Sequence, residues 1–420
     1  MQREREFLWE ETVVDMILEP AKELKVSGNY DTVVVGGGFA GVAAALAAAR
    51  GGNKVLLCER MFMLGGLGTA GLVTIYLPLC DGRGHQVSYG IAEELLKVSI
   101  EDGYETRYPK PWLENGTLEE RAQTRYLVRY NAAACAIAYE KLLLNAGVEL
   151  LYGTTVCDTI VSNGLITHLI VENKSGRSAI ACGNVIDCSG DADVARFAGE
   201  ETAQYGKGNI LAAWYYYTNE DGNQLQMLGF SDMNIDKGSK RPGENEAMVN
   251  KRRYVGLEAD EITDFVINSH KSTYNHFLAG KPLSNDHMLT TIATIPQVRM
   301  TRGLKGDYWM TRDDNHKVME DSVGMFSDWH GKGDGSVYEV PFRALHGNRI
   351  KNLAAAGRTI AADDMMWDLT RVIPVCSVTG EAAGTAAALS KNFTDVDIKT
   401  LQQTLIKNGV KLHRDWELTE

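Results

Sequence analysis

Residues 30–60 restrict the fold more than any other segment of the chain. They read YDTVVVGGGFAGVAAALAAARGGNKVLLCER: a short β-branched run, a glycine turn, an alanine-rich stretch that ends at Gly51-Gly52, and a second apolar run. β-branched residues favour strands, and alanine favours a helix that glycine then terminates. The segment therefore predicts one βαβ unit of a parallel sheet.

The turn in this unit has the spacing G-x-G-x-x-G, with Phe39 and Ala40 between its last two glycines. Gly36 permits the tight turn, Gly38 lets the backbone approach a pyrophosphate, and Gly41 lets helix and strand pack closely. Glu59 ends the second run 23 residues after Gly36, where an acid accepts hydrogen bonds from a ribose. The pattern predicts a dinucleotide with an unphosphorylated adenosine ribose, and NAD and FAD both remain open at this point.

Later segments add to this unit. A helix is predicted over 131–145, followed by three short β runs between 155 and 190 that are separated by Asn-Gly and Ser-Gly hairpin signals. An apolar run at 352–356 leads through Gly357-Arg358 to a second small-residue helix. The predicted fold class is α/β: a Rossmann-like parallel sheet that binds the dinucleotide, with an inserted three-stranded β-meander, plus a second α+β domain for the substrate.

The predicted domains are discontinuous. We expect a lead-in arm at 1–28, a dinucleotide-binding domain made of 29–75, 121–205 and 343–392, a substrate domain made of 76–120 and 206–342, and a C-terminal tail at 393–420. Within the substrate domain, the polar stretch DKGSKRPGENE predicts an exposed loop.

Charge and cysteine content exclude several kinds of partner. The net charge of -12 disfavours nucleic acid and anionic lipid. No apolar run approaches the roughly 20 residues that span a bilayer, and the charged N-terminus does not resemble a signal peptide, so we expect a cytoplasmic protein without membrane partners. The seven cysteines form no C-x-x-C, which gives no support to a redox pair, a metal site or an iron-sulfur cluster.

Three further features favour FAD over NAD. A second glycine loop, GGLGTAG, follows Glu59 and Arg60; the meander ends in VIDCSGD; and a distant C-terminal segment returns as AAAGRTIAADDMMWDLTRVIPVCSVTGEAAGTAAAL. With these segments in this order, the chain resembles the FAD-dependent oxidoreductases of the glutathione-reductase structural class, distantly similar to fumarate reductase and succinate dehydrogenase flavoproteins. The resemblance covers roughly residues 18 to 392 and is more specific for FAD than for a substrate.

The resemblance implies a set of FAD-binding residues. Asp187-Cys188-Ser189-Gly190 stands where the family usually has Asp-Ala-Thr-Gly, so cysteine replaces alanine there. The implied FAD contacts are Gly36, Gly38, Phe39, Ala40, Gly41, Glu59, Arg60, Gly65, Gly66, Thr69, Val156, Ser189, Gly190, Gly357, Arg358 and Val372.

Departures from better known relatives exclude some functions. No second strand-glycine-helix unit is available for NAD(P)H, which argues against pyridine-nucleotide disulfide reductases. No histidine stands at 64–71, where fumarate-reductase-like relatives attach flavin covalently, so a dissociable FAD is expected. His85 is a minor candidate for covalent attachment.

The candidate catalytic residues are Arg299, Arg302, His330 and Arg371. The stretch 294–302 resembles an arginine-rich strand of the family, in which Arg299 and Arg302 clamp a substrate carboxylate or simply form ion pairs. His330 has the chemistry to move a proton at neutral pH, with a structural role as the alternative. Arg371 opens the C-terminal helix near the expected flavin ring.

The predicted activity is hydride transfer between flavin N5 and a small-molecule substrate, with the electron donor or acceptor left open. Two alternatives remain: a reductase of an unsaturated substrate that takes electrons from an external donor, and a flavin-binding protein without catalysis. The helix expected from about Pro374 to Ala388 is predicted to point its N-terminus at the N1/C2=O edge of the flavin and to stabilise negative charge there.

Overall fold

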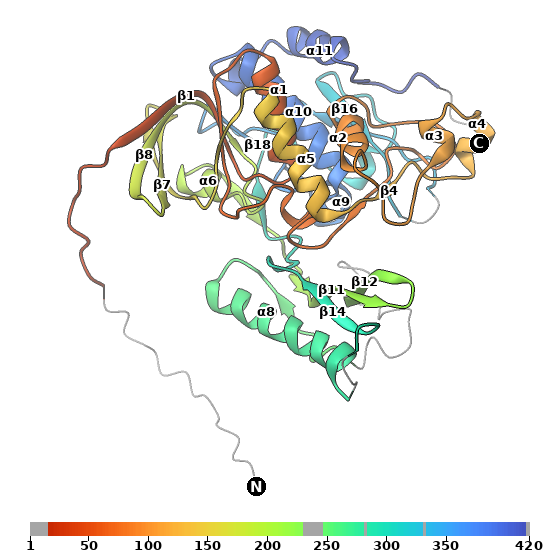
Figure 1. Ribbon diagram of the computed structural model, residues 1–420. Coiled ribbons are helices and arrows are strands. Elements are labelled where there is room, and N and C mark those ends of the chain that lie inside the picture. The colour runs from red at the N-terminus through yellow and green to blue at the C-terminus, as the bar shows by residue number, and fades with distance from the viewer. Residues whose placement is uncertain (1–15, 230–246, 281–283, 331–332, 417–420) are drawn as a thin grey trace.

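The computed structural model describes residues 16–229, 247–280, 284–330 and 333–416. In Figure 1 a large body holds the main sheet and most helices, and a smaller layer beneath it contains α8, β11, β12 and β14. The predicted loop DKGSKRPGENE and most of the lead-in arm lie outside the described residues.

The main sheet has seven strands and confirms the predicted α/β class. Its order is β5-β2-β1-β8-β7-β6, and β18 also pairs with β8. All pairings among the first four strands and β18 are parallel, whereas β6, β7 and the first half of β8 form the antiparallel meander. The bounds are β1 (Val26–Val35), β2 (Val55–Cys58), β5 (Glu149–Leu151), β6 (Thr155–Ser162), β7 (Leu165–Asn173), β8 (Gly176–Asp187) and β18 (Leu353–Ala355).

The register of the parallel strands brings the sequence motifs to one edge. Val35 at the end of β1 pairs with Cys58 on β2 and with Asp187 on β8, and Asp187 pairs with Ala355 on β18. The carboxyl ends of these strands therefore lie side by side. In open α/β sheets this edge is where ligands bind.

Two small-residue helices pack together on one face of the sheet. They are α1 (Phe39–Arg50) and α10 (Ile373–Leu389). A Cβ added at Gly380 would lie 2.3 Å from the carbonyl oxygen of Ala40, and one added at Gly384 would lie 2.2 Å from that of Ala44. The glycines of the C-terminal helix are thus required for its close contact with α1.

The remaining elements of the large body cover this core. They are β3 (Ile75–Tyr76), α2 (Ile91–Ser99), α3 (Lys110–Leu113), α4 (Leu118–Ala122), β4 (Val128–Arg129), α5 (Ala132–Asn145), α6 (Asp193–Phe197), β9 (Thr202–Gln204), β15 (Arg302–Leu304), β16 (Ser322–Phe326), β17 (Tyr338–Pro341), α9 (Asp364–Thr370) and α11 (Ile398–Lys407). Leu95 and Trp112, from the segment 76–120, share one hydrophobic cluster with α1 and α10. The predicted domain boundaries stay a prediction, but this segment packs on the large body.

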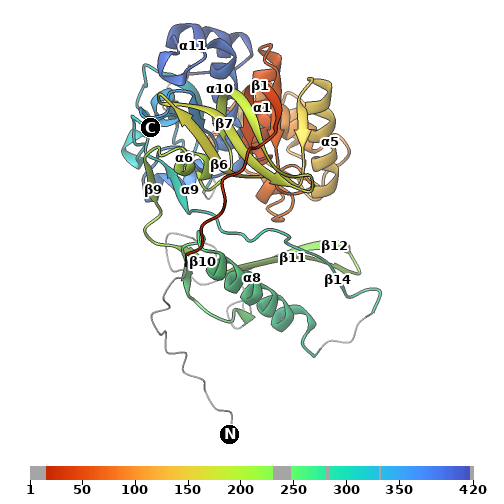
Figure 2. The ribbon, with the colours of Figure 1, turned by 90° about the vertical axis from the view of Figure 1, so that its left-hand side faces the viewer.

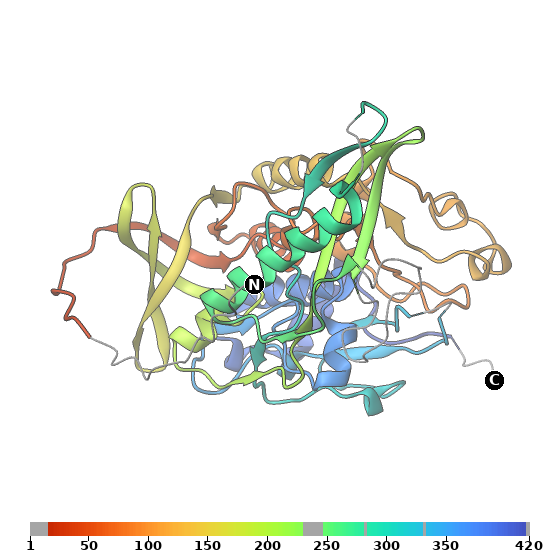
Figure 3. The same ribbon diagram turned by 90° about the horizontal axis from the view of Figure 1, so that it is seen from below.

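The smaller layer is a three-stranded antiparallel sheet with one long helix. Strands β12 (Gly222–Gly229) and β14 (Met288–Ile292) flank β11 (Ala212–Asn219), and α8 (Ala259–Thr273) packs against them, as Figures 2 and 3 show from two sides. Tyr215, Phe265 and Phe277 lie in its core. The short strands β10 (Asn209–Ile210) and β13 (Arg253–Tyr254) pair with each other, and Ile210 and Tyr254 belong to the same hydrophobic cluster.

The stretch 294–302 is not the predicted strand. Residues 294–301 form an irregular segment, and β15 begins only at Arg302. Pro296 has no N–H to donate to a ladder, and the amides of Arg299 and Met300 both donate to the side-chain oxygen of Asn209 at 2.9 Å. These backbone donors are therefore occupied by one side chain and not by a neighbouring strand.

No single helix in the described ranges is long and apolar enough to cross a membrane. Helices α9 and α10 together satisfy the length and composition requirement, but they are bent by 86° relative to each other.

Candidate functional site

A cavity of about 420 Å³ lies at the carboxyl edge of the main sheet. Its wall combines the two glycine loops, the end of the meander, the turn after β18, the start of α10 and the irregular segment at 295–298. The predicted residues in this wall are Gly36, Gly38, Phe39, Ala40, Glu59, Arg60, Gly65, Gly66, Val156, Ser189, Gly190, Gly357, Arg358 and Arg371. Segments far apart in sequence thus form one site.

Each of the three motif glycines has a different environment, and each environment matches one of the three roles that glycines have in a dinucleotide-binding motif. Gly36 has a φ of +102°, and a Cβ there would lie 2.3 Å from the carbonyl oxygen of Cys188. A Cβ at Gly41 would lie 1.8 Å from the carbonyl oxygen of Gly36. At Gly38 an added Cβ would meet no atom within 4 Å, so Gly38 faces open space at the N-terminus of α1. This space fits the pyrophosphate of a dinucleotide.

Glu59 is held with its carboxylate against the glycine turn. Its two oxygens accept hydrogen bonds from the amides of Gly37 at 2.6 Å and Met61 at 2.7 Å. The residue is 6% exposed and lines the cavity. Each carboxylate oxygen has a second lone pair, so the ribose hydroxyls of an adenosine fit this acceptor.

The second glycine loop lies directly against the first. Gly38 and Gly65 form an isolated bridge, and the amide of Gly65 donates to the carbonyl of Gly37 at 2.8 Å. Thr69 is not in the cavity wall; it is buried, and its hydroxyl donates to the carbonyl of Leu64 at 2.5 Å. The structure therefore gives Thr69 the role of bracing this loop, in place of the predicted FAD contact.

Arg358 joins three segments around the cavity. Its guanidinium donates to the carbonyls of Gly190 and Val298, and to the carboxylate of Asp191 at 2.6 Å. The turn after β18, the end of the meander and the irregular segment at 298 are thereby linked through one side chain.

The N-terminus of α10 opens into the same cavity. Arg371, Ile373 and Cys376 line it, whereas Val372 is the N-cap residue and does not. The unpaired amides of the first helical turn and the helix dipole favour negative charge at this end.

Arg302 does not form the predicted carboxylate clamp. Its Nε donates to the carbonyl of Asp191 at 2.9 Å, and its Nη2 forms an ion pair with Asp193 at 2.6 Å. Asp193 lies in the cavity wall, and burial together with the nearby Asp191 raises its pKa to about 6. The Nε and Nη2 groups of Arg302 therefore bind the end of the meander, as the ion-pair alternative expected.

His330 lies between two carboxylates outside the cavity wall. Its Nδ1 is 2.6 Å from Asp328 and its Nε2 is 3.1 Å from Asp368. Hydrogen bonds to Asp328 and then Asp368 raise the pKa of His330 to about 9. The ring is thus an imidazolium at neutral pH with no lone pair to accept a proton, which favours a positioning role over the proton transfer that the sequence suggested.

The carboxylates around His330 also hold arginines. Asp368 pairs with Arg371 at 2.5 Å, and Asp328 pairs with Arg312 at 2.6 Å. Burial alone would raise the pKa of each aspartate, but the bonds from His330 and these arginines hold both well below the ordinary value. Asp368 thereby fixes Arg371 at the cavity wall. We call this group, with the neighbouring Arg299, the cationic cluster.

Sequence analysis missed several residues of the site. Asp191, Asp193, Ile295, Pro296, Ile373 and Cys376 also line the cavity. Asp191 and Asp193 stand one and three residues after the Ser-Gly of the meander, and Asp368 stands three residues before Arg371 at the end of α9. The spacing therefore carried a signal for these acids. Ile295 and Pro296 lie in the stretch 294–302 that resembles the family's arginine-rich strand, but the candidates predicted from that stretch are only Arg299 and Arg302.

Comparison with known proteins identifies the family. The model of the family described as "FAD dependent oxidoreductase" matches residues 31–211 and 213–405. The chain belongs to this family. It is accordingly an FAD-dependent oxidoreductase, and the residues in the cavity wall fit that cofactor.

Individual relatives are distant. Thioredoxin reductase of Ureaplasma parvum serovar 3 is 34% identical over 76 residues, which cover 18% of this chain and a quarter (25%) of that protein. L-Proline dehydrogenase of P. horikoshii is 12% identical, covering 93% of this chain and 100% of that one, with a TM-score of 0.40. The 3-ketosteroid-Δ4-(5α)-dehydrogenase of Rhodococcus jostii RHA1 is 14% identical, with coverage of 87% and 98% and a TM-score of 0.42.

Proposed function

We propose that this FAD-dependent oxidoreductase binds its flavin non-covalently and transfers a hydride between flavin N5 and a small organic substrate. The observation that carries the proposal is the meeting of three parts in one cavity. The glycine loops, the N-terminus of α10 with Arg371, and residues 295–298 of the irregular segment all line it. A cofactor bound at the glycine loops is therefore accessible to a substrate that lies beside the N-terminus of α10 and residues 295–298.

FAD, when bound, accepts or releases a hydride at N5 of its ring. The chain supplies binding and electrostatics. The amides at the start of α1 face the space at Gly38, Glu59 offers its carboxylate to a ribose, and the N-terminus of α10 favours the negative charge of a reduced flavin. Arg371, fixed by Asp368, adds a positive charge at the same wall.

The position of His85 supports non-covalent binding. Its Nδ1 lies 3.0 Å from Asp81, its ring stacks on Trp416 with centroids 4.8 Å apart, and it is not in the cavity wall. The glycine loop at 64–71 contains no histidine. Acid precipitation of the purified yellow protein should therefore release FAD into the supernatant.

A pair of glycine variants tests the cofactor site. Gly38→Ala places a Cβ in open space, so we expect the apo fold to persist while FAD affinity falls at least about tenfold through a clash with the diphosphate. Gly36→Ala is the contrasting variant, because its Cβ meets the Cys188 carbonyl and should reduce stability itself. Unchanged FAD affinity in Gly38→Ala would contradict the placement of the diphosphate.

Stopped-flow mixing under anaerobic conditions tests the reaction. A small organic compound that bleaches the oxidised flavin directly supports the proposed direction. Bleaching only by reduced nicotinamide or an electron-carrier protein, followed by reoxidation with an unsaturated compound, would replace it with the externally fed reductase. A colourless protein that binds only NAD would end the proposal.

A further inference from the structure

A second cavity, of about 300 Å³, lies in the smaller layer between α8 and β11. Val266, Ser269, His270 and Thr273 line it from one face of α8. Residues 212–214 of β11 and residues 292–297, from the end of β14 onward, complete its wall. Residues 295 and 296 also line the cavity at the glycine loops, so the two cavities are neighbours. The proposed hydride transfer makes no use of the second cavity.

The wall of the second cavity favours an uncharged molecule. Among the described residues that line it, none is Asp, Glu, Lys or Arg, and most are apolar, including Trp214, Val266 and Ile292. The guanidinium of Arg299 lies 5.4 Å from the ring centroid of Trp214, but Arg299 is not part of the wall. A charged ligand would therefore lose its water without gaining a partner of opposite charge, which is costly.

Three polar side chains of this wall already have hydrogen-bond partners. The hydroxyl of Ser269 donates to a backbone carbonyl of β11 at 2.7 Å. The amide and the hydroxyl of Thr294 both donate to the carbonyl of Ala70, at 2.8 and 3.3 Å, and Nε2 of Gln297 donates to the carbonyl of Gly71 at 2.7 Å. These bonds hold one side of the cavity against the second glycine loop, so the cavity is preformed.

Thr273 is a buried polar residue of the wall without such a partner. It is 5% exposed, and within the described ranges its hydroxyl forms no hydrogen bond. By contrast, the hydroxyls of Thr263, Ser269 and Ser272 on the same helix each donate to a backbone carbonyl, at 2.8, 2.7 and 2.8 Å. A buried hydroxyl ordinarily has a hydrogen-bond partner. The free hydroxyl of Thr273 therefore points to a polar group of a ligand in the cavity.

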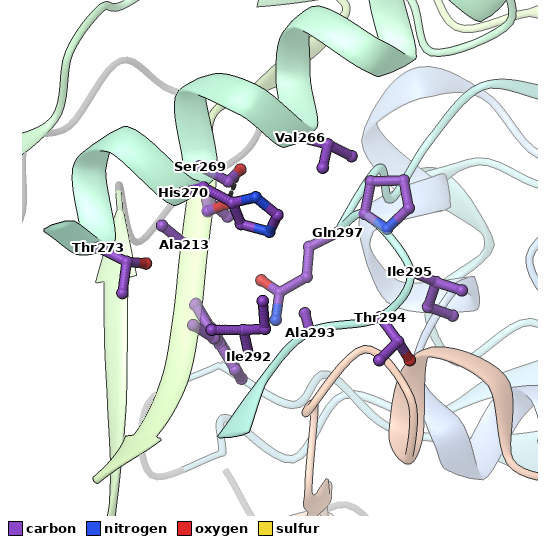
Figure 4. Close-up of a pocket in the computed structure, with 13 residues that line it drawn as sticks. Ala213, Val266, Ser269, His270, Thr273, Ile292, Ala293, Thr294, Ile295 and Gln297 are labelled. Atoms are coloured by element: carbon purple, nitrogen blue, oxygen red, sulfur yellow. Dashed lines mark hydrogen bonds between the residues drawn. The ribbon is translucent and has the colours of Figure 1, made fainter. Parts of the chain in front are cut away.

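His270, one turn before Thr273 on α8, is the other free polar group of the wall. Within the described ranges it forms no hydrogen bond and no ion pair, but it is exposed. Figure 4 shows its ring directed from α8 toward Gln297. Because water reaches the ring of His270, only the buried hydroxyl of Thr273 depends on a ligand for its hydrogen bond.

The volume of the cavity indicates the size of the ligand. An apolar cavity of about 150 Å³ in another protein binds benzene. The second cavity has about twice that volume, so a molecule of two fused rings fits it. The ring of Trp214 in the wall provides an aromatic face for such a molecule.

We propose that the second cavity is a ligand site, which binds an uncharged aromatic molecule of about two rings through a hydrogen bond between its hydroxyl group and Thr273. The apolar wall accommodates the rings, and the hydroxyl of Thr273 gains the partner that it lacks within the chain. The site lies outside the cavity at the glycine loops. The inference therefore goes beyond the proposed function and does not depend on hydride transfer.

The test uses the FAD-loaded protein and three probes with the same two rings: 2-naphthol, naphthalene and 2-naphthoate. Isothermal calorimetry measures the affinity of each probe without turnover. A hydroxyl that found no partner in the cavity would lose its water and weaken binding. Because Thr273 supplies a partner, 2-naphthol should bind at least about fivefold more tightly than naphthalene. The anion 2-naphthoate should bind at least about tenfold more weakly than 2-naphthol, because the wall contains no cationic side chain to pair with it.

Two variants locate the probe. Thr273→Val keeps the shape of the side chain and removes a hydroxyl without a partner, so the fold should persist while the preference for 2-naphthol over naphthalene is lost. Thr263→Val is the matched control, because Thr263 is an exposed threonine of α8 outside the wall; it should keep the preference. Ala293→Phe fills the cavity from the side of β14 and should weaken 2-naphthol and naphthalene alike. The flavin absorbance of each variant shows that FAD is retained.

The outcomes decide between a built site and an unspecific apolar surface. Loss of the preference in Thr273→Val, together with weaker binding in Ala293→Phe, supports the proposal. A 2-naphthol affinity no higher than that of naphthalene, tighter binding of 2-naphthoate, or no binding of any probe would overturn it. An unchanged preference in Thr273→Val, or unchanged affinities in Ala293→Phe, would overturn it as well.

Discussion

Replacing His330 by glutamine removes the cation that joins Asp328 to Asp368. In the wild-type protein the pKa of His330 is raised from 6.5 to about 9 by these two carboxylates. Folding therefore favours the protonated ring, and the resulting stability is fully present below about pH 6.5. It declines as the pH rises toward 9 and is lost above that value. His330→Gln has no such titration, so its free energy of unfolding should change less over this range.

The size of the effect follows from the pKa and the exposure. A rise from 6.5 to about 9 corresponds to at most about 3.4 kcal/mol at 1.36 kcal/mol per pH unit. The side chain of His330 is 41% exposed, so solvent screening reduces this value, and we expect about 1–2 kcal/mol. Wild-type protein should lose that much more stability than His330→Gln between pH 6 and pH 9.5.

Urea unfolding of both FAD-loaded proteins at the two pH values measures this difference. The ring of Trp329 stacks on His330 with centroids 3.9 Å apart, so its fluorescence gives a local titration, obtained as the difference from Trp329→Phe. Asp328→Asn removes one partner and should move the titration of His330 to lower pH. Parallel stability profiles for wild type and His330→Gln, with a Trp329 titration near pH 6.5, would refute the reasoning.

Two further predictions concern the cofactor. Glu59→Ala removes a charged hydrogen-bond acceptor from the cavity and should weaken FAD binding by about 1.5–3 kcal/mol. Fluorescence titration of the apo protein with FAD measures this change. Glu149→Ala, at an exposed position on β5, is the control and should leave the FAD affinity unchanged. Sulfite should bleach the oxidised flavin, because the N-terminus of α10 at Ile373 favours negative charge in the cavity; an absorbance that does not respond to sulfite would count against that orientation.

The main sheet and its glycine loops were predictable from sequence because short local sequence patterns determine them. The turn at Gly36, the small-residue helices and the hairpin signals of the meander each depend on a few neighbouring residues. The register of parallel strands then brings the loops together whatever lies between them. Most of the FAD-site residues expected from sequence accordingly lie in one cavity wall.

The candidates for substrate chemistry were less predictable because their partners are distant in sequence. Arg299 and Arg302 are three residues apart and were expected to act together. In the structure Arg302 pairs with Asp193, more than a hundred residues earlier, whereas Arg299 donates a hydrogen bond to Gln297 and lies over the ring of Trp214. The spacing of the two arginines on an expected strand could not predict that they have different partners. The strand itself is absent at 294–301.

The irregular backbone at 294–301 lets neighbouring residues contact the same region of the protein, which a strand would not allow. In a strand, alternate side chains would face opposite sides, so neighbouring residues could not all serve one region. Here Ile295 and Pro296 line both the cavity at the glycine loops and a second cavity between α8 and β11, which Gln297 also lines. The carbonyl of Val298 accepts a hydrogen bond from Arg358 at the cavity by the glycine loops. Because Asn209 takes the amides of Arg299 and Met300, the segment holds this shape without a sheet. Asn209 therefore lets one short segment line both cavities, and replacing Asn209 by alanine should loosen both walls together.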